Sequence, residues 1–403
     1  MENGMRIAVI ADCYTPMKIS AAVMLDDLAY ELKIQGHLPV VIVPDSNIKE
    51  GVSRSVSQNI EVIRVSAPRT KDIDFIRRTL AEVAMPFIML RRLHESGIQL
   101  DNFDGIVWYS PSIFHGPLVK KLKDINRCKS YLILRDIFPE WARNLGIMRK
   151  GLPYLFFKMI ERYQYSVADK IGVQTPANIQ YFSTRPDKAL SKVEVLHNWM
   201  KTPSSRSSSC SISLSDGPLA GRKIFVYPGN MGKAQDIAQF MDVIAMLDQL
   251  RTDVGFVFVG RGSEVAALTE EITNRCLGNV LIFDEIRHDE ISGLYAQCDF
   301  GMVFLDSRHK THNIPGKFIS YMHYGLPTLA CVNKGNDLLD LVRSRRLGYA
   351  LDTVDTDITI SAIFDMVDDP DYVKQIPENC RTCAREMFST SNTAKQITNS
   401  LGQ

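Results

Sequence analysis

The chain has 403 residues, which is too long for one ordinary core and favours two domains of about 200 residues each. Its hydrophobic content of 45% and charged content of 23% are those of a folded enzyme, and they exclude a disordered or fibrous protein. The formal net charge of +1 argues against broad nucleic-acid binding, so we expect no nucleic-acid partner.

The predicted elements alternate between short apolar strands and amphipathic helices along nearly the whole chain. The first set comprises a strand at Arg6–Ile10, a helix at Ala22–Lys33, and strands at Val40–Val43, Glu61–Val65, Gly105–Tyr109, Tyr131–Leu134 and Lys170–Val173. The second set has strands at Lys223–Tyr227, Gly255–Val259, Val280–Phe283, Phe300–Phe304 and Thr328–Val332. Nearly continuous apolar strands indicate parallel sheets covered by helices on both faces, which predicts an α/β fold of two doubly wound, Rossmann-like units.

The segment KTPSSRSSSCSISLSDGPLAG separates the two sets. It is rich in serine and has no apolar period, which is typical of an exposed linker. We therefore expect an N-terminal domain at 1–200, a linker at 201–221, a C-terminal domain at 222–385, and a last helix at 386–403 that packs back towards the N-terminal domain. Two such units facing across a cleft would bind ligands at the carboxyl ends of their strands.

The segment IFVYPGNMGKAQD predicts a strand, a glycine-containing turn and a helix. Gly229 and Gly232 permit a tight backbone, and Lys233 adds a cation at the expected helix start. The turn is not a P-loop, because Tyr227 and Ala234 stand where the P-loop pattern requires glycine and Ser/Thr. A nucleoside triphosphatase is therefore disfavoured.

The segment THNIPGKFISYMHYGLP predicts a second helix, capped by Asn313, started near Pro315 and stopped by Gly325. Lys317 falls in its first turn, where the helix dipole disfavours a cation unless an anion binds there. Lys233 and Lys317 at two helix starts of one sheet would suit a pyrophosphate. The alternatives are that the Lys317 side chain extends into solvent and that the turn at Lys233 only connects a strand to a helix.

The order of VYPGNMGKAQD, FVGRGSE, VLIFDEIRHDEISGLYAQCDFGMVFL and THNIPGKFISYMHYGLPTLA resembles the C-terminal half of glycosyltransferase family 4, retaining enzymes of the GT-B fold. The segments AAVMLDDLAYELKIQGH, RDIFPEWARNLGIM and VEVLHNWM are similar to its N-terminal half. RDIFPEW and HNIPGKFISYM look most like the branch that transfers N-acetylated deoxyaminosugars, such as N-acetyl-fucosamine, in bacterial O-antigen or capsule assembly.

The resemblance implies a UDP-sugar donor in the C-terminal domain, with the base held near Ile286. Ser320 stands where most of the family has a glutamate that binds the ribose, and His312 replaces the glutamate eight residues earlier. Asn230 stands where many members have arginine. The implied donor-binding residues are Gly229, Asn230, Lys233, Arg261, Ile286, His312, Asn313, Pro315, Gly316, Lys317 and Ser320.

For catalysis we expect Lys233 and Lys317 to stabilise the leaving diphosphate by preorganised charge, with no metal and no cofactor. The family implies retention of configuration, with a diphosphate oxygen taking the acceptor proton. His115 in SPSIFHGPL and Asp136 in RDIFPEW each follow a predicted strand of the N-terminal domain. Either could orient the hydroxyl of a saccharide acceptor linked to undecaprenyl diphosphate, although a lone histidine in such a loop is more often structural.

The segment at residues 69–94 carries the pairs Arg77-Arg78 and Arg91-Arg92 on either side of the apolar stretch Val83–Leu90. This pattern would suit a helix on an anionic membrane surface, or equally a helix packed on the core. No apolar run approaches the ~18 residues that span a bilayer, and the N-terminus has no leader pattern. We expect a cytoplasmic protein with a peripheral membrane contact at most.

Two other functions stay open at this point. A UDP-sugar 2-epimerase would also use two such domains, but it needs acid and base carboxylates, and Ser320 and His312 occupy two places where acids would be expected. A non-catalytic nucleotide-sugar-binding subunit is favoured by the same replacements.

Overall fold

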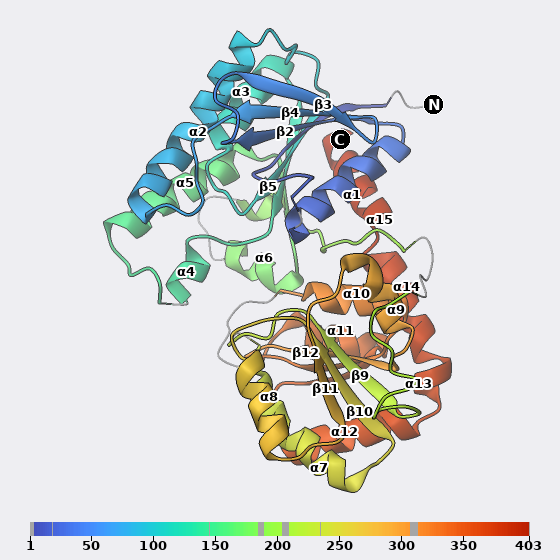
Figure 1. The fold of residues 1–403 in the computed structure, drawn as a ribbon. Coiled ribbons are helices and arrows are strands. Elements are labelled where there is room, and N and C mark those ends of the chain that lie inside the picture. Colours follow the sequence, from blue (N-terminus) through green and yellow to red (C-terminus); the bar gives the residue numbers. More distant parts are fainter. Residues whose placement is uncertain are drawn as a thin grey trace. The chain divides into compact units, whose positions relative to one another are not determined.

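The computed structural model describes residues 4–17, 19–144, 146–183, 189–203, 209–233, 235–306 and 313–402. The chain forms two compact units (Figure 1). The first contains the residues up to Lys201 together with those from Thr390 onwards, and the second is Thr202–Ser389. The first unit is therefore built from two separate stretches of the chain.

The first unit has a mainly parallel sheet. Its elements are β1 (Arg6–Ile10), α1 (Ser20–Ile34), β2 (Leu38–Asp45), β3 (Val52–Ser57), β4 (Ile60–Ser66), α2 (Phe75–Glu95), β5 (Gly105–Ser110), α3 (Gly116–Asn126), β6 (Lys129–Leu134), α4 (Glu140–Asn144), α5 (Leu152–Val167), β7 (Lys170–Val173), α6 (Pro176–Ser183), β8 (Val193–Val195) and α15 (Thr390–Gly402). In the described residues the strand order is β3-β4-β2-β1-β5-β6-β7-β8, and only β3 runs antiparallel to its neighbour.

Helices cover both faces of this sheet (Figure 1). The core on one face takes its helical side chains from α1 and α15, for example Leu25, Leu28 and Ile397. The core on the other face takes them from α2, α3, α5 and α6. Because both faces are buried, the central strands are apolar without alternation, as the sequence predicted.

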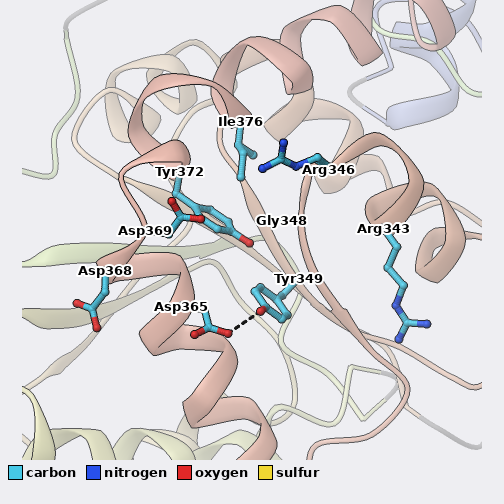
Figure 2. Close-up of a pocket in the computed structure, with 9 residues that line it drawn as sticks. All are labelled: Arg343, Arg346, Gly348, Tyr349, Asp365, Asp368, Asp369, Tyr372 and Ile376. Atoms are coloured by element: carbon cyan, nitrogen blue, oxygen red, sulfur yellow. Dashed lines mark hydrogen bonds between the residues drawn. The ribbon is translucent and has the colours of Figure 1, made fainter.

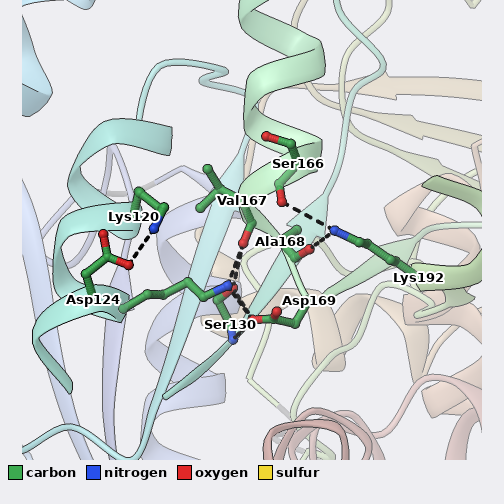
Figure 3. Close-up of polar contacts among 9 residues, drawn as sticks. Lys120, Asp124, Ser130, Ser166, Val167, Ala168, Asp169 and Lys192 are labelled. Atoms are coloured by element: carbon green, nitrogen blue, oxygen red, sulfur yellow. Dashed lines mark hydrogen bonds and ion pairs between the residues drawn. The ribbon is translucent and has the colours of Figure 1, made fainter. Parts of the chain in front are cut away.

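Two lysines contact the carboxyl end of α5: Lys123 of α3, and Lys192, the last residue of a 3₁₀ helix at Ala189–Lys192. Figure 3 shows the contact of Lys192. Lys123 Nζ lies 2.8 Å from the Val167 carbonyl oxygen and 2.6 Å from Asp169, which also accepts hydrogen bonds from Ser130. Lys192 Nζ donates to the Ala168 carbonyl at 2.7 Å. Cations at a helix carboxyl end pair with its free carbonyl groups and its dipole.

The second unit also has a doubly wound sheet. Its elements are β9 (Lys223–Pro228), α7 (Met241–Leu250), β10 (Val254–Val259), α8 (Val265–Asn274), β11 (Val280–Phe283), α9 (Ile291–Tyr295), β12 (Phe300–Phe304), α10 (Gly316–Tyr324), β13 (Thr328–Cys331), α11 (Asp337–Arg345), β14 (Gly348–Leu351), α12 (Thr356–Asp368), α13 (Asp371–Lys374) and α14 (Ile376–Met387), with short 3₁₀ helices at Ile237–Phe240 and His288–Glu290. The order is β11-β10-β9-β12-β13-β14, and the pairs are parallel. The predicted α/β class is confirmed.

The expected linker differs from the structure in its second half. Ile212, Leu214 and Leu219 are buried. The backbone N–H of Ser211 donates to Glu290, and that of Leu214 donates to Gln297. Residues 209–221 are therefore part of the second unit, and the serine-rich composition hid three apolar anchors.

Helix α2 packs one side of its apolar stretch on the core. Met85, Pro86 and Met89, between the arginine pairs, are buried, as the core-packed alternative expected, whereas Phe87 in the same stretch is 57% exposed. The membrane contact expected of this helix stays a prediction. Within the described ranges, no helix combines the length and the apolar character needed to cross a bilayer.

Candidate functional site

The second sheet reverses its strand order between β9 and β12, which is where ligands bind in doubly wound sheets. Gly229 follows β9 directly, and α10 follows β12. Gly229 has φ of +121°, and a Cβ placed on it would lie 3.8 Å from Lys317 Nζ. The structure thus brings together the two motifs, 88 residues apart, that the sequence singled out for an anion.

Lys317 is the second residue of α10, after the N-cap residue Pro315. Its ammonium lies over the ring of Tyr227, with Nζ 3.3 Å from the ring centroid. Burial lowers the pKa of Lys317 to about 7. Among the described residues no carboxylate pairs with it, so a cation and the free N–H groups of a helix start are available to one anion.

The turn after β9 departs from the sequence prediction. Lys233 is exposed and lies in a turn, four residues before the 3₁₀ helix at Ile237, so the prediction of a helix start at Lys233 is wrong. The turn is held instead by Gln235, whose side-chain oxygen accepts from Asn230 Nδ2 at 3.0 Å and from the Gly232 N–H at 3.1 Å. No sequence pattern identified Gln235.

The structure contradicts one expectation about the segment before α10 and does not describe the residue of another. Asn313 does not cap α10, because the N-cap position is Pro315 and no side chain bonds there. His312 lies outside the described residues. Ser320, in the second turn of α10, forms a hydrogen bond with the hydroxyl of Tyr295 in α9. Burial raises the pKa of Tyr295, and the hydrogen bond with Ser320 offsets part of that rise.

The loops after β10 and β11 complete this edge of the sheet. Gly260 and Gly262 have φ of +148° and +159°, and a Cβ on either would lie 2.1 Å from the carbonyl oxygens of Gly229 and Met231. Arg261 between them is exposed and pairs with Glu285 at 3.0 Å, beside Ile286 in the loop after β11. The FVGRGSE motif is therefore a backbone support for the Gly229 turn.

The first sheet has its own reversal of strand order, between β1 and β5. His115 follows β5 as the N-cap residue of α3 and is fully buried. Its Nε2 lies 2.6 Å from Asp12 Oδ1, at the end of β1, and its Nδ1 has no hydrogen-bond partner among the described residues. Since the Asp12 side chain is 30% exposed, a ligand at this edge would reach Asp12 before His115.

Further charged groups surround this pair. Burial, with repulsion from Asp12, raises the pKa of Glu82 on α2. Burial also raises the pKa of Asp136, although the neighbouring Arg135 partly offsets the shift. The structure therefore places His115, Asp12, Glu82 and Asp136 at the carboxyl edge of the first sheet, and the sequence pattern had pointed to neither Asp12 nor Glu82.

A pocket of about 570 Å³ lies at the opposite edge of the second sheet (Figure 2). Gly348, which starts β14, lines it, together with Arg343, Arg346 and Asp368. Tyr349 donates to Asp365 at 2.6 Å across it. Because it lies at the amino ends of the strands and carries both signs of charge, we do not assign it to the site of Lys317.

Within the described ranges, no group of three or more His, Cys, Asp or Glu side chains lies close enough together to hold a metal ion. The expectation of a metal-free site stays a prediction.

Comparisons with known proteins show which family model and which folds this chain is similar to. Residues 222–369 match the family model described as Glycosyl transferases group 1. The whole chain is similar to the crystal structure of Anabaena Alr3699/HepE in complex with UDP, with a TM-score of 0.66, 17% identity, and coverage of 99% of this chain and 100% of that one. The fold is that of the GT-B glycosyltransferases.

Two further proteins are similar to this chain, one in structure and one in sequence. WaaG, a glycosyltransferase involved in lipopolysaccharide biosynthesis, is similar with a TM-score of 0.61 and 15% identity over 97% of this chain and 99% of its own. A Pseudomonas aeruginosa protein named "Probable glycosyltransferase WbjE" is 23% identical over 234 residues, which are 55% of each chain. That alignment spans about half the length of the curated relative.

Proposed function

We propose that this GT-B protein is a retaining glycosyltransferase that moves an N-acetylated (deoxy)hexosamine from a UDP-sugar to a lipid-linked saccharide in O-antigen or capsule synthesis. The observation that carries the proposal is the Lys317 ammonium at the start of α10, beside Gly229 at the strand-order reversal of the second sheet. This part of the chain lies within the segment that matches the glycosyl transferases group 1 model. The UDP in HepE and the lipopolysaccharide pathway of WaaG support the donor and product classes.

In the proposed reaction, negative charge grows on the diphosphate as the sugar leaves. Lys317 and the N–H groups of Gly316 and Lys317 would stabilise that charge, with Lys233 adding a second cation from its turn. The acceptor hydroxyl would give its proton to a diphosphate oxygen as the new glycosidic bond forms on the same face. This route needs no metal and no side-chain base.

The first unit would hold the acceptor, a saccharide linked to undecaprenyl diphosphate. Asp12, oriented by His115, and Asp136 would contact its hydroxyl groups at the carboxyl edge of the first sheet. Such an acceptor implies a cytoplasmic protein with a peripheral membrane contact and no nucleic-acid partner.

A mass-spectrometric screen of the purified protein against a panel of UDP-sugars, with and without a lipid-linked saccharide, tests the proposal. We expect one UDP-sugar to be consumed only when acceptor is present, with an equal yield of UDP and extended acceptor. Isomerisation of the donor without acceptor would identify an epimerase. Binding of UDP-sugar with no turnover on any acceptor would identify a non-catalytic subunit.

A further inference from the structure

The first half of α5 and the segment before it expose several large apolar side chains to solvent. In and before α5, the side chains of Ile147, Leu152, Leu155 and Met159 are 64%, 83%, 61% and 63% exposed. Contiguous exposed apolar side chains of this size mark interaction surfaces. We call these four residues, together with Arg149, Lys150 and Arg162, the α5 surface.

The exposure follows from how α5 is held. Its buried side chains, Glu161, Gln164, Tyr165 and Val167, all lie in its second half. That half is also where Lys123 and Lys192 donate hydrogen bonds to the backbone carbonyl groups of Val167 and Ala168. In the first half, Phe157 turns inwards against Phe114 and Phe138. The opposite side of the first half keeps its apolar side chains in solvent.

The charges on the α5 surface have one sign. Arg149, Lys150 and Arg162 are exposed, and none forms an ion pair with the described residues. Glu161, the carboxylate within α5, is fully buried and pairs with Lys158 at 2.6 Å. From residue 146 to residue 163 the exposed charges are therefore positive.

Helix α2, on the same face of the sheet, provides the contrast (Figure 1). It also exposes four large apolar side chains, those of Phe75, Ile76, Leu80 and Phe87, so exposed apolar surface alone does not distinguish it from α5. Its four arginines, however, have carboxylate partners. Arg77 pairs with Asp74, Arg78 with Glu82, and Arg91 with Glu95, each at 3.3 Å or less. Arg92 lies 3.7 Å from Glu95 and 3.9 Å from Glu50. The balanced charge of α2 gives it little attraction to an anionic surface.

We propose that the α5 surface is the part of this protein that docks on an anionic lipid bilayer. An apolar helix face bordered by unpaired basic side chains is the pattern of a helix that lies in the membrane interface. The leucine and methionine side chains would enter the acyl boundary, while Arg149, Lys150 and Arg162 would contact lipid phosphates. The proposal deepens the peripheral contact proposed above by naming its surface and its lipid charge.

Sedimentation with sucrose-loaded vesicles tests it, using the full chain and no sugar nucleotide. We expect binding to vesicles that contain phosphatidylglycerol and little binding to pure phosphatidylcholine. Each cation near an anionic surface contributes about fivefold to partitioning, so Arg149→Gln/Lys150→Gln should weaken binding by roughly 30-fold. Leu152→Ser/Leu155→Ser should weaken binding by at least roughly tenfold, and both positions are exposed enough to leave folding intact.

Arg77→Gln/Arg78→Gln on α2 is the matched control, because it removes the same charge from helix positions that are already ion-paired. It should retain nearly full vesicle binding. Equal loss from the α2 and α5 variants, or wild-type protein that ignores anionic vesicles, would overturn the proposal.

The α5 surface could instead bind a second copy of the chain. Light scattering tests this alternative, because it measures whether the protein is a monomer or a dimer in solution. A dimer that Leu152→Ser/Leu155→Ser converts to a monomer, without vesicle binding by the wild type, would assign the surface to self-association and overturn the proposal. UDP titration of the same variants should match the wild type. Since vesicle binding requires no turnover, the lipid assignment and the proposed transferase activity can fail independently.

Discussion

Lys317 Nζ lies 3.3 Å from the centroid of the Tyr227 ring, and this pair joins the start of α10 to the end of β9. The face of an aromatic ring attracts a cation without carrying a formal charge. An arriving diphosphate would therefore displace only this weak partner from the ammonium. A carboxylate in the place of Tyr227 would compete with the donor.

The first prediction concerns Lys317 itself. Lys317→Ala should weaken UDP binding by about 2–4 kcal/mol, because a charge-assisted contact in a partly dry site is lost. Lys374→Ala, an exposed lysine on α13, is the matched control and should bind UDP like the wild type. Calorimetric titration measures both. Unchanged affinity in a folded Lys317→Ala protein would remove this lysine from the donor site.

The second prediction is a pH dependence of UDP binding. The pKa of Lys317 is lowered to about 7, so the free protein loses this positive charge above neutral pH. UDP affinity should fall by up to about tenfold per pH unit above 7, since binding then requires proton uptake. In Lys317→Met this slope should be absent, and an identical slope in both proteins would contradict the assignment.

The second prediction extends to stability, because the lowered pKa of Lys317 also makes the free energy of unfolding depend on pH. Its pKa rises from about 7 in the folded protein to an ordinary value near 10.5 in the unfolded chain. Between these values the unfolded state binds more protons, so this group makes the free energy of unfolding increase with pH. Urea unfolding of Lys317→Met should show a stability advantage over the wild type that is largest near pH 6 and shrinks towards pH 9.

The third prediction separates the two contacts of Tyr227. Its hydroxyl donates to the Asn230 carbonyl at 2.9 Å, and its ring faces Lys317. Tyr227→Phe should cost about 1 kcal/mol of stability through the lost hydrogen bond and keep most of the UDP affinity. Tyr227→Leu should also lower UDP affinity, because Lys317 loses its ring support. Thermal melting and UDP titration distinguish the two, and equal affinity in both variants would refute a role for the ring.

The fourth prediction uses two glycines of the same edge. A Cβ added to Gly316 would have no other atom within 4 Å, whereas a Cβ on Gly260 would meet the Gly229 carbonyl oxygen at 2.1 Å. Gly316→Ala should therefore raise helix stability by up to about 1 kcal/mol and still weaken UDP binding, because the methyl group covers the N–H groups of the helix start. Gly260→Ala should lose about 1–3 kcal/mol of stability. A Gly316→Ala protein with wild-type UDP affinity would show that the diphosphate does not approach there.

The fifth prediction concerns Asp12 in the first unit. Asp12→Asn should lower acceptor-dependent turnover by roughly tenfold or more, because the amide no longer fixes His115 and the acceptor as the carboxylate does. UDP affinity should stay within about twofold of the wild type, since α10 and its turn lie in the other unit. Asp124→Asn, on the exposed side of α3, is the control and should leave both quantities unchanged.

Much of the fold was predictable because buried parallel strands leave continuous apolar runs. The predicted strands at β1, β7, β11 and β12 match the structure at both ends. By contrast, β3 was missed, because its sequence VSRSVS is largely exposed and has no buried apolar run. Backbone pairing with β4, which the sequence does not reveal, holds it in the sheet. Three-residue β8 is too short to leave a pattern.

The site was predictable only where local sequence determines local shape. Pro315 and Gly325 bound α10 as expected, so Lys317 was placed correctly. The bond between His115 and Asp12 joins residues 103 positions apart, and only the strand order of the sheet reveals it. Lys233 was misplaced because its glycine-rich turn continues instead of entering a helix.

The last helix, α15, has a consequence for dissecting the molecule. Leu401 packs on Gly105 in β5, and Gln396 donates to Glu194 and to the Val195 carbonyl in β8. A truncation at residue 389 would strip this cover from the first sheet and uncover its apolar side chains. The stretch from Thr202 to Ser389, in contrast, is uninterrupted, so a single gene fragment can encode the whole second unit for isotope labelling and crystallisation.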